Sequence, residues 1–346
     1  MPAGSMATNV PHQMVGIDRM PTKQGSSGRL SRWLRVESAI LSSRYRYSEN
    51  SEGIATGNGA QHREAFKGNF NFDSSGRYQV VAGVFAGNGI TRGWSNTGWG
   101  SGSGQTNVFL KQLYFSGRPV SGLHLEYGGL YVLHGESTEI TSYDYHVYLV
   151  GQRISLQRPT RFFLDEISIT YAYLGDFDQP NLLKRFDRLK KSNYHQYLVS
   201  KKLGRQMVVS ADYTSAAGSK IFRQAFKTRL PARVPVDSLH FENYQRTGCR
   251  PGYGIGAYLE KLLLKRLKIG GGYASIDRNY GSLNSDHFSI GKRLYATANL
   301  GISPGFGIAV FVTRSVANDH PLPVRTRLDL VLSYNLLGLV NRAGLF

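Results

Sequence analysis

Short segments in which apolar and polar residues alternate follow one another along almost the whole chain. In FKGNFNFDSSGRYQVVAGVFAGNG, residues 66–89, Phe66, Phe70 and Phe72 alternate with polar residues, and a second alternating run begins at Tyr78. A period of two is typical of β-strands, and the short polar stretch between the runs predicts a hairpin turn. An aromatic face can pack against a protein core or against lipid, so one hairpin does not choose between a soluble sandwich and a membrane barrel.

The alternation predicts about sixteen strands in all. They cover residues 32–47, 62–72, 78–87, 107–116, 123–133, 147–157, 162–174, 192–202, 207–213, 220–230, 236–246, 253–262, 268–277, 287–300, 306–315 and 325–336. The first odd-numbered connections are long, namely 48–61, 88–106, 134–146 and 176–192. The even-numbered connections, such as DSSGR, GRPVSG and LGRQ, are short; the later odd ones keep the bias less strongly, and TSAAG breaks it.

This sorting of loop length favours one topology. In an up-and-down antiparallel barrel all odd connections lie at one end, and outer-membrane barrels have long loops at one end and short turns at the other. A Greek-key sandwich has no reason to sort its loops in this way. We therefore predict an all-β fold, a single transmembrane up-and-down antiparallel β-barrel of about 16 strands (about 14 to 18), with short periplasmic turns and longer extracellular loops.

The two faces of the predicted strands agree with a wet interior. In the strand 123–133, His124 and Glu126 lie opposite leucine and tyrosine residues, and the last strand places charges opposite leucines in the same way. Charged residues on the second face of so many strands do not suit a dry core, because burying an unpaired charge costs many kcal/mol. In the first strand the apolar residues change register, which predicts a bulge near Ser42 and Ser43.

Composition and charge narrow the class further. The chain has 40 Gly and 12 Pro, its formal net charge is +19, and its mean hydropathy of −0.30 is compatible with a barrel that alternates its two faces. A basic excess favours polyanionic partners such as phosphate, acidic polysaccharide or anionic lipid. The polar residues 1–30 predict a flexible arm before a barrel spanning 31–346. The start of the chain contains no apolar stretch typical of a signal peptide, so for an exported protein the sequence would be a mature or truncated form. Cys249 is the only cysteine and cannot form an internal disulfide.

With this pattern over residues 31–346, and with an aromatic residue, Phe346, at its end, the chain resembles the outer-membrane porins of Gram-negative bacteria. The resemblance rests on architecture and not on a diagnostic motif. It implies a sixteen-stranded barrel; the phosphate-selective and alginate-export porins are the relatives with a basic interior, and no residue singles out either. Counted back by twos from Phe346, the residues do not show the apolar alternation of a closing strand.

The candidate functional residues are charged side chains on the polar strand faces, which we predict to line the pore. They are Lys67, Glu126, Arg153, Glu166, Arg223, Lys227, Arg293, Arg327 and Asp329. An excess of cations would concentrate anions and bias permeation by charge. The alternative is that these charges pair across the wall and stiffen it.

Three other stretches carry possible chemistry. Residues 182–191 have apolar residues at helical spacing and a basic opposite face, which predicts a short amphipathic helix in a loop that could enter the pore, meet lipopolysaccharide or stay solvated. The loop 134–146 could bind a divalent ion through residues such as Glu136, although a solvated acidic loop is more common. The Gly-rich 93–104 lacks the context of a phosphate-binding loop. We find no catalytic motif, and predict neither an enzyme nor a metal or cofactor.

The sequence thus predicts a porin in the bacterial outer membrane that lets small hydrophilic solutes diffuse, with anion preference. Its expected partners are membrane lipid, lipopolysaccharide and small hydrophilic or anionic solutes, with a homotrimer as a possible assembly, and not nucleic acid. The alternatives are a dedicated channel for an acidic polysaccharide or phosphate, and a soluble β-rich binding protein.

Overall fold

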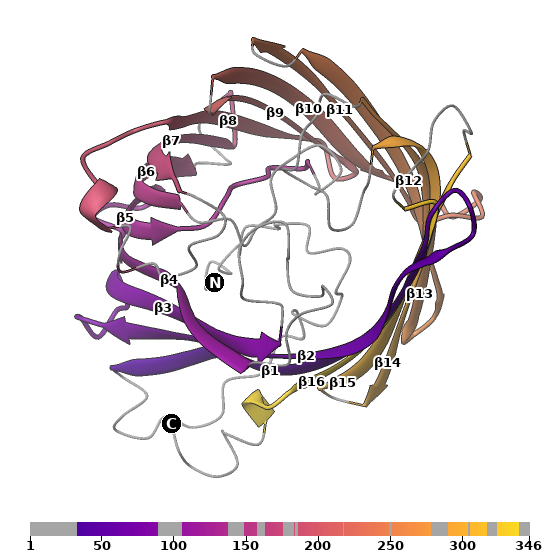
Figure 1. Cartoon of the computed structure of the whole chain (residues 1–346). Coiled ribbons are helices and arrows are strands. Elements are labelled where there is room, and N and C mark those ends of the chain that lie inside the picture. The colour runs from indigo at the N-terminus through magenta and orange to yellow at the C-terminus, as the bar shows by residue number, and fades with distance from the viewer. Residues whose placement is uncertain are drawn as a thin grey trace.

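The sixteen strands form one closed antiparallel barrel. The computed structural model describes residues 33–88, 106–137, 149–157, 163–175, 183, 186–216, 218–248, 251–277, 290–303, 305–316 and 324–338. Each strand pairs with the strands before and after it in the chain, and β1 pairs with β16 to close the ring (Figure 1). The predicted fold class, strand number and up-and-down topology are confirmed.

The strand bounds are β1 Leu34–Glu49, β2 Ala55–Asn71, β3 Tyr78–Asn88, β4 Thr106–Gly117, β5 Leu123–Leu130, β6 Leu149–Gln157, β7 Glu166–Leu174, β8 Tyr194–Leu203, β9 Met207–Ala216, β10 Ser219–Arg229, β11 Ser238–Gly248, β12 Gly252–Leu264, β13 Leu267–Ile276, β14 Gly291–Ser303, β15 Phe306–Ser315 and β16 Thr326–Asn335. Every predicted strand matches one of these. The arm predicted at 1–30, Cys249, the Gly-rich 93–104 and Phe346 lie outside the described residues.

The first long loop predicted from the sequence is wrong. Residues 48–61 are mostly strand, because β1 continues to Glu49 and β2 already begins at Ala55. The Gly- and Asn-rich start of β2 has little propensity for strand, but it pairs with β1, and the Tyr45 hydroxyl donates to Asn58 Oδ1 at 2.7 Å. Pairing with a well-formed neighbour therefore outweighs local propensity here.

The two ends of the barrel still differ. Every even-numbered connection is short, from residues 72–77 between β2 and β3 to 304–305 between β14 and β15. The connections after β3, β5, β7, β13 and β15 are longer, whereas those after β1, β9 and β11 are not. We call the end that carries the even-numbered connections the short-turn end.

The bulge expected in β1 exists, but it lies at Glu37 and not near Ser42 and Ser43. The register shifts between Val36 and Ser38, where Glu37 is the extra residue. Its carboxylate lies 2.8 Å from Lys67 Nζ and accepts a hydrogen bond of 2.7 Å from Asn69 Nδ2. The bulge thus places a carboxylate where it can pair with β2.

A second bulge explains Phe85, whose place on the polar face of β3 is otherwise unexpected. The pairing of β3 with β4 shifts at Gly83 and Val84, which leaves Lys111 of β4 as an extra residue. Lys111 Nζ lies 5.4 Å from the centre of the Phe85 ring, a cation–π contact. The aromatic ring therefore packs under a buried cation on the inner face.

Large apolar side chains cover the outside of the barrel. Phe70 and Phe72 are 47% and 52% exposed, and their rings meet edge to face at 5.5 Å. Tyr78 stacks on Phe115 beside them, and Phe66 is exposed on the same face, as the alternation predicted. At the other end of the barrel, the hydroxyls of Tyr171 and Tyr197 lie 2.8 Å apart. Aromatic rings therefore gather near both ends of the outer wall. Within the described residues, no helix has the length and apolar character needed to cross a membrane.

Candidate functional site

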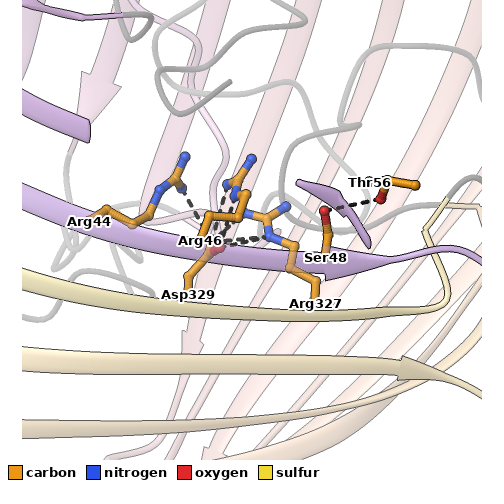
Figure 2. A network of polar contacts seen from close by, with 6 residues as sticks. All are labelled: Arg44, Arg46, Ser48, Thr56, Arg327 and Asp329. Carbon is orange, nitrogen blue, oxygen red and sulfur yellow. Dashed lines mark hydrogen bonds and ion pairs between the residues drawn. The ribbon is translucent and has the colours of Figure 1, made fainter. Parts of the chain in front are cut away.

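Three arginines meet one aspartate where β1 and β16 close the barrel. Arg46 Nε lies 2.8 Å from Asp329 Oδ1 and its Nη2 lies 3.2 Å from Oδ2, which is a two-pronged contact. Arg44 Nη1 approaches Oδ2 at 3.3 Å, and Arg327 contacts both carboxylate oxygens, with Nε at 3.1 Å from each. Figure 2 shows these side chains rising from the two strands toward the barrel interior. We call Arg44, Arg46, Arg327 and Asp329 the seam cluster.

The strand register explains why these residues meet although about 280 residues of chain separate them. Arg46 lies directly opposite Asp329 in the β1–β16 pair, while Arg44 and Arg327 are two positions away on the same face. Directly opposite and diagonal neighbours in a sheet are within reach of long side chains. Arg327 also lies 5.7 Å from the Phe311 ring centre of β15. Arg46 is the most accessible of the three arginines, with 16% of its side chain exposed.

The opposite side of the barrel carries a buried pair of opposite charges. Arg223 on β10 lies directly opposite Asp212 on β9, with Nε at 2.9 Å from Oδ2 and Nη2 at 2.5 Å from Oδ1. Thr214 also donates to Asp212 at 3.0 Å. Both charged side chains are at most 1% exposed. This geometry suits a structural ion pair better than contact with a solute.

A second group on that side centres on Glu260 of β12. Lys227 Nζ lies 3.4 Å from Glu260 Oε2, Lys268 Nζ contacts Oε1, and Ser238 donates to Oε2 at 3.1 Å. The side chains of Lys227 and Lys268 remain 28% and 39% exposed. We call the inner face of β8–β13, which carries both groups, the far wall.

The chain leaves the wall after β5 and runs inside the barrel (Figure 1). Arg153 of β6 holds the start of this stretch. Its Nη1 lies 2.8 Å from Glu126, its Nη2 donates to the Tyr131 carbonyl, and its guanidinium lies 4.6 Å from the Tyr131 ring centre. Arg153 is thereby 2% exposed. We call residues 131–137 the inner segment.

The inner segment then docks on the far wall. The Leu133 carbonyl accepts a hydrogen bond of 2.8 Å from Gln196 of β8, and the Glu136 N–H donates to Ser210 of β9 at 2.8 Å. Gly135 has a φ of +58°, and a Cβ there would lie 2.8 Å from Leu198 Cδ1 and 2.9 Å from Ser210. Only glycine permits both this backbone conformation and this close approach.

Burial raises the pKa of the Glu136 carboxyl to about 7. The positive charges of Lys227 and Lys202 act in the opposite direction, and the negative charge of Glu166 adds to the rise. His240 of β11 hydrogen-bonds the Glu136 backbone. The tip of the inner segment is therefore a partly desolvated acid among basic groups of the far wall.

Most of the predicted pore-lining residues lie on the inner face in ion pairs. Lys67 pairs with Glu37, Arg153 with Glu126, Arg223 with Asp212, Lys227 with Glu260 and Arg327 with Asp329. Arg293 is fully buried and donates to the Ile290 carbonyl at 3.3 Å and to the Val324 carbonyl. Glu166 accepts from Ser168 at 3.1 Å. The wall-stiffening alternative thus gains physical support for several of them, and their part in conduction stays a prediction.

The structure adds residues that the sequence analysis missed. They are Glu37, Arg44, Arg46, Asp212 and Glu260. Asp212 and Glu260 alternate with apolar neighbours and could have been found by the same rule. Arg44 and Arg46 alternate with Tyr45 and Tyr47 in β1, and the sequence analysis assigned neither arginine to the pore.

The other candidate stretches are only partly described. The described residues of the basic stretch 182–191 include a short 3₁₀ helix, η2 at Phe186–Arg188, and Arg188 lies 5.8 Å from the ring centre of Tyr173. Of the acidic loop 134–146, the residues from 138 lie outside the described part. Across the residues that are described, no group of three potential metal ligands gathers.

Comparison with solved structures finds the same architecture in porins. Two engineered variants of the Rhodopseudomonas blastica porin match with TM-scores of 0.55 and 0.56, each at 10% sequence identity and over 87% of this chain and 99% of that chain. The chain has the porin fold. A third match, described as "Asymmetric conductivity of engineered proteins", covers the same shares at 9% identity with a TM-score of 0.55. No family model and no curated protein matches the sequence. At such low identity the likeness concerns the porin fold alone.

Proposed function

We propose that this chain forms a channel in the bacterial outer membrane through which small hydrophilic solutes diffuse passively. The observation that carries the proposal is the contrast between the two faces of a closed porin-type barrel. Its outer face exposes aromatic and aliphatic side chains, whereas its inner face carries charged and polar ones together with buried tyrosine and aliphatic side chains. Such a barrel satisfies all its backbone hydrogen bonds without an edge, which a lipid environment demands.

The proposed channel prefers anions. In the seam cluster three guanidinium groups contact one carboxylate, and the whole chain carries a formal net charge of +19. Arginine side chains supply a fixed positive charge. Fixed positive charge along a pore raises the local concentration of anions.

Planar-bilayer recording under a salt gradient tests the proposal. We expect defined single-channel steps and a reversal potential on the anion side. Arg46→Gln removes the most accessible charge of the seam cluster, and we expect it to lower the anion-to-cation permeability ratio by about twofold.

Lys268→Gln is the matched control, because it also removes one inner-face cation but near the short-turn end on the far wall. It should shift the ratio less than Arg46→Gln does. Absence of conductance from correctly folded barrels would reject the channel, while cation selectivity of the unmodified protein would reject only the anion preference.

A channel dedicated to phosphate or to an acidic polysaccharide is the second candidate. The seam cluster favours it, since guanidinium forks match phosphate and carboxylate oxygens in pairs. Inorganic phosphate at millimolar concentration should then block chloride current in the unmodified protein and block it less in Arg46→Gln. Equal block in both proteins would leave general diffusion as the function.

A further inference from the structure

A hollow on the outside of the barrel and the charges below it form a surface that the channel function does not use. The hollow lies across β8–β11, has a volume of about 420 Å³ and is largely apolar. Val199 and Val209 line one side, and Phe226 and Phe241, whose rings stack at 5.7 Å, line the other. Ala211 is small, which leaves the space between them open.

The position of the hollow along the barrel is set by the register. Lys201 and Val209 form one residue pair of its lining, and only two further pairs separate them from the β8–β9 turn. At a rise of about 3.3 Å per residue, this part of the hollow lies about 7 Å from the turn. It is therefore on the half of the wall next to the short-turn end.

The turns of the short-turn end that lie next to the hollow are strongly basic. The cations in or next to the turns after β8, β10 and β12 are Lys201, Lys202, Arg205, Arg229, Arg233, Lys261, Lys265 and Arg266. Asp165, just before β7, pairs with Lys201 at 3.6 Å, and Asp237, just before β11, pairs with Lys261 at 3.0 Å. Glu260 lies beside them on the inner face and pairs with Lys227 and Lys268. Arg205 and Arg233 lie in the turns themselves, and Arg205 is exposed.

We propose that this surface binds an anionic phospholipid. One acyl chain lies in the hollow against Phe226 and Phe241, and the phosphate contacts Arg205 and Arg233 in the turns below. The inference rests on the proposed membrane location, since only a barrel in lipid presents its outer face to acyl chains. The apolar hollow favours any lipid, whereas the cationic turns favour a net negative headgroup by about fivefold in binding for each arginine near it.

A competition between two lipids tests the proposal. The barrel in neutral detergent is given equimolar dioleoyl phosphatidylglycerol and dioleoyl phosphatidylcholine, and the retained lipid is counted by native mass spectrometry. We expect phosphatidylglycerol to be retained about 10- to 30-fold more strongly. Arg205→Gln with Arg233→Gln should remove most of this preference.

Two matched controls locate the site. Arg77→Gln with Arg118→Gln removes two cations from turns on the other side of the same end, after β2 and β4, and should keep the preference. Ala211→Trp fills the hollow and should lower retention of both lipids, whereas Ala296→Trp on the exposed outer face of β14 should not.

Equal retention of the two lipids would overturn the proposal. So would equal loss in the two arginine pairs, since that would mean diffuse attraction to the whole basic end. Inorganic phosphate that displaces the lipid at equimolar concentration would show that the turns hold a free anion and not a lipid. Channel conductance is recorded from the same preparations, so that failure of the membrane barrel itself is seen separately from failure of the lipid site.

Discussion

The seam cluster and the far wall both hold charged residues on the inner face of the barrel, but their charges are balanced in different ways. On the far wall Arg223 and Asp212 face each other in register and are both buried, so each charge has one close counterpart. At the seam, Arg44, Arg46 and Arg327 share the single carboxylate of Asp329. The Arg223–Asp212 pair is therefore neutral, whereas the seam cluster holds three positive charges and one negative charge.

The two arrangements suit different roles, which a count of the charges alone would not distinguish. A neutral, fully buried pair fixes the register of neighbouring strands, but it contributes little field to the interior. A shared carboxylate holds several arginines in place and leaves part of their charge uncompensated by the cluster. The far wall also differs from the seam in that it binds the inner segment, through Ser210 and Gln196.

Removal of the shared carboxylate should have the largest effect. Asp329→Ala leaves three guanidinium groups of the seam cluster without their common counter-ion, and breaking a buried ion pair typically costs about 3 to 5 kcal/mol. We expect a loss of barrel stability at or above the top of this range, measured by urea unfolding in detergent with the shift between folded and unfolded bands on a gel.

Asp212→Ala is the comparison, because it deprives only Arg223 of its carboxylate. Its cost should stay within the same range and below that of Asp329→Ala. The double change Asp212→Ala with Arg223→Ala should recover part of the loss. If Asp329→Ala destabilised the barrel less than Asp212→Ala, the distinction between a carboxylate shared by three arginines and one paired with a single arginine would be wrong.

Gly135→Ala should release the inner segment from the far wall. An added Cβ would collide with Leu198 and Ser210, and the φ of +58° strains any other residue. We expect a cost of about 1 to 3 kcal/mol for the docked state and a larger, noisier single-channel conductance. Gly53→Ala is the control, because Gly53 has a φ of +79° but nothing within 4 Å of an added Cβ. Unchanged conductance in Gly135→Ala would mean that the inner segment does not narrow the pore.

Much of the fold could be predicted from alternation alone, because a closed barrel forces every strand to show one face outward. Phe66 and Phe70 therefore reveal their strand without any knowledge of its neighbours. Loop length was less reliable: residues 55–61 look like a loop, and only pairing with β1 makes them a strand.

The candidate site was harder to predict, because its contacts join strands that are far apart in the chain. Nothing local links Arg46 to Asp329, because their contact depends on how β1 and β16 pair to close the ring. The inner segment was likewise hidden, since residues 131–133 continue the alternation of β5 and look like strand.

The smallest effect we expect is a dependence of inner-segment docking on pH. Burial raises the pKa of Glu136 to about 7, above its ordinary value near 4.5, so the docked state binds a proton more tightly than the released state. Docking is then strongest below about pH 4.5, weakens as the pH rises to about 7, and stays weakened above that. The groups that face Glu136 are Lys202, Lys227, His240 and Glu166.

Conductance noise recorded between about pH 5 and pH 8 measures this dependence. Release of the inner segment should become more frequent by about 10-fold or more across the range, since one unit of pKa shift corresponds to about 1.4 kcal/mol. Glu136→Gln removes the titrating group and should make the noise nearly independent of pH while keeping the hydrogen bond from the backbone to Ser210. A pH response that survives in Glu136→Gln but vanishes in His240→Gln would contradict this prediction. It would mean that the titrating group is His240 of the far wall and not Glu136 of the inner segment.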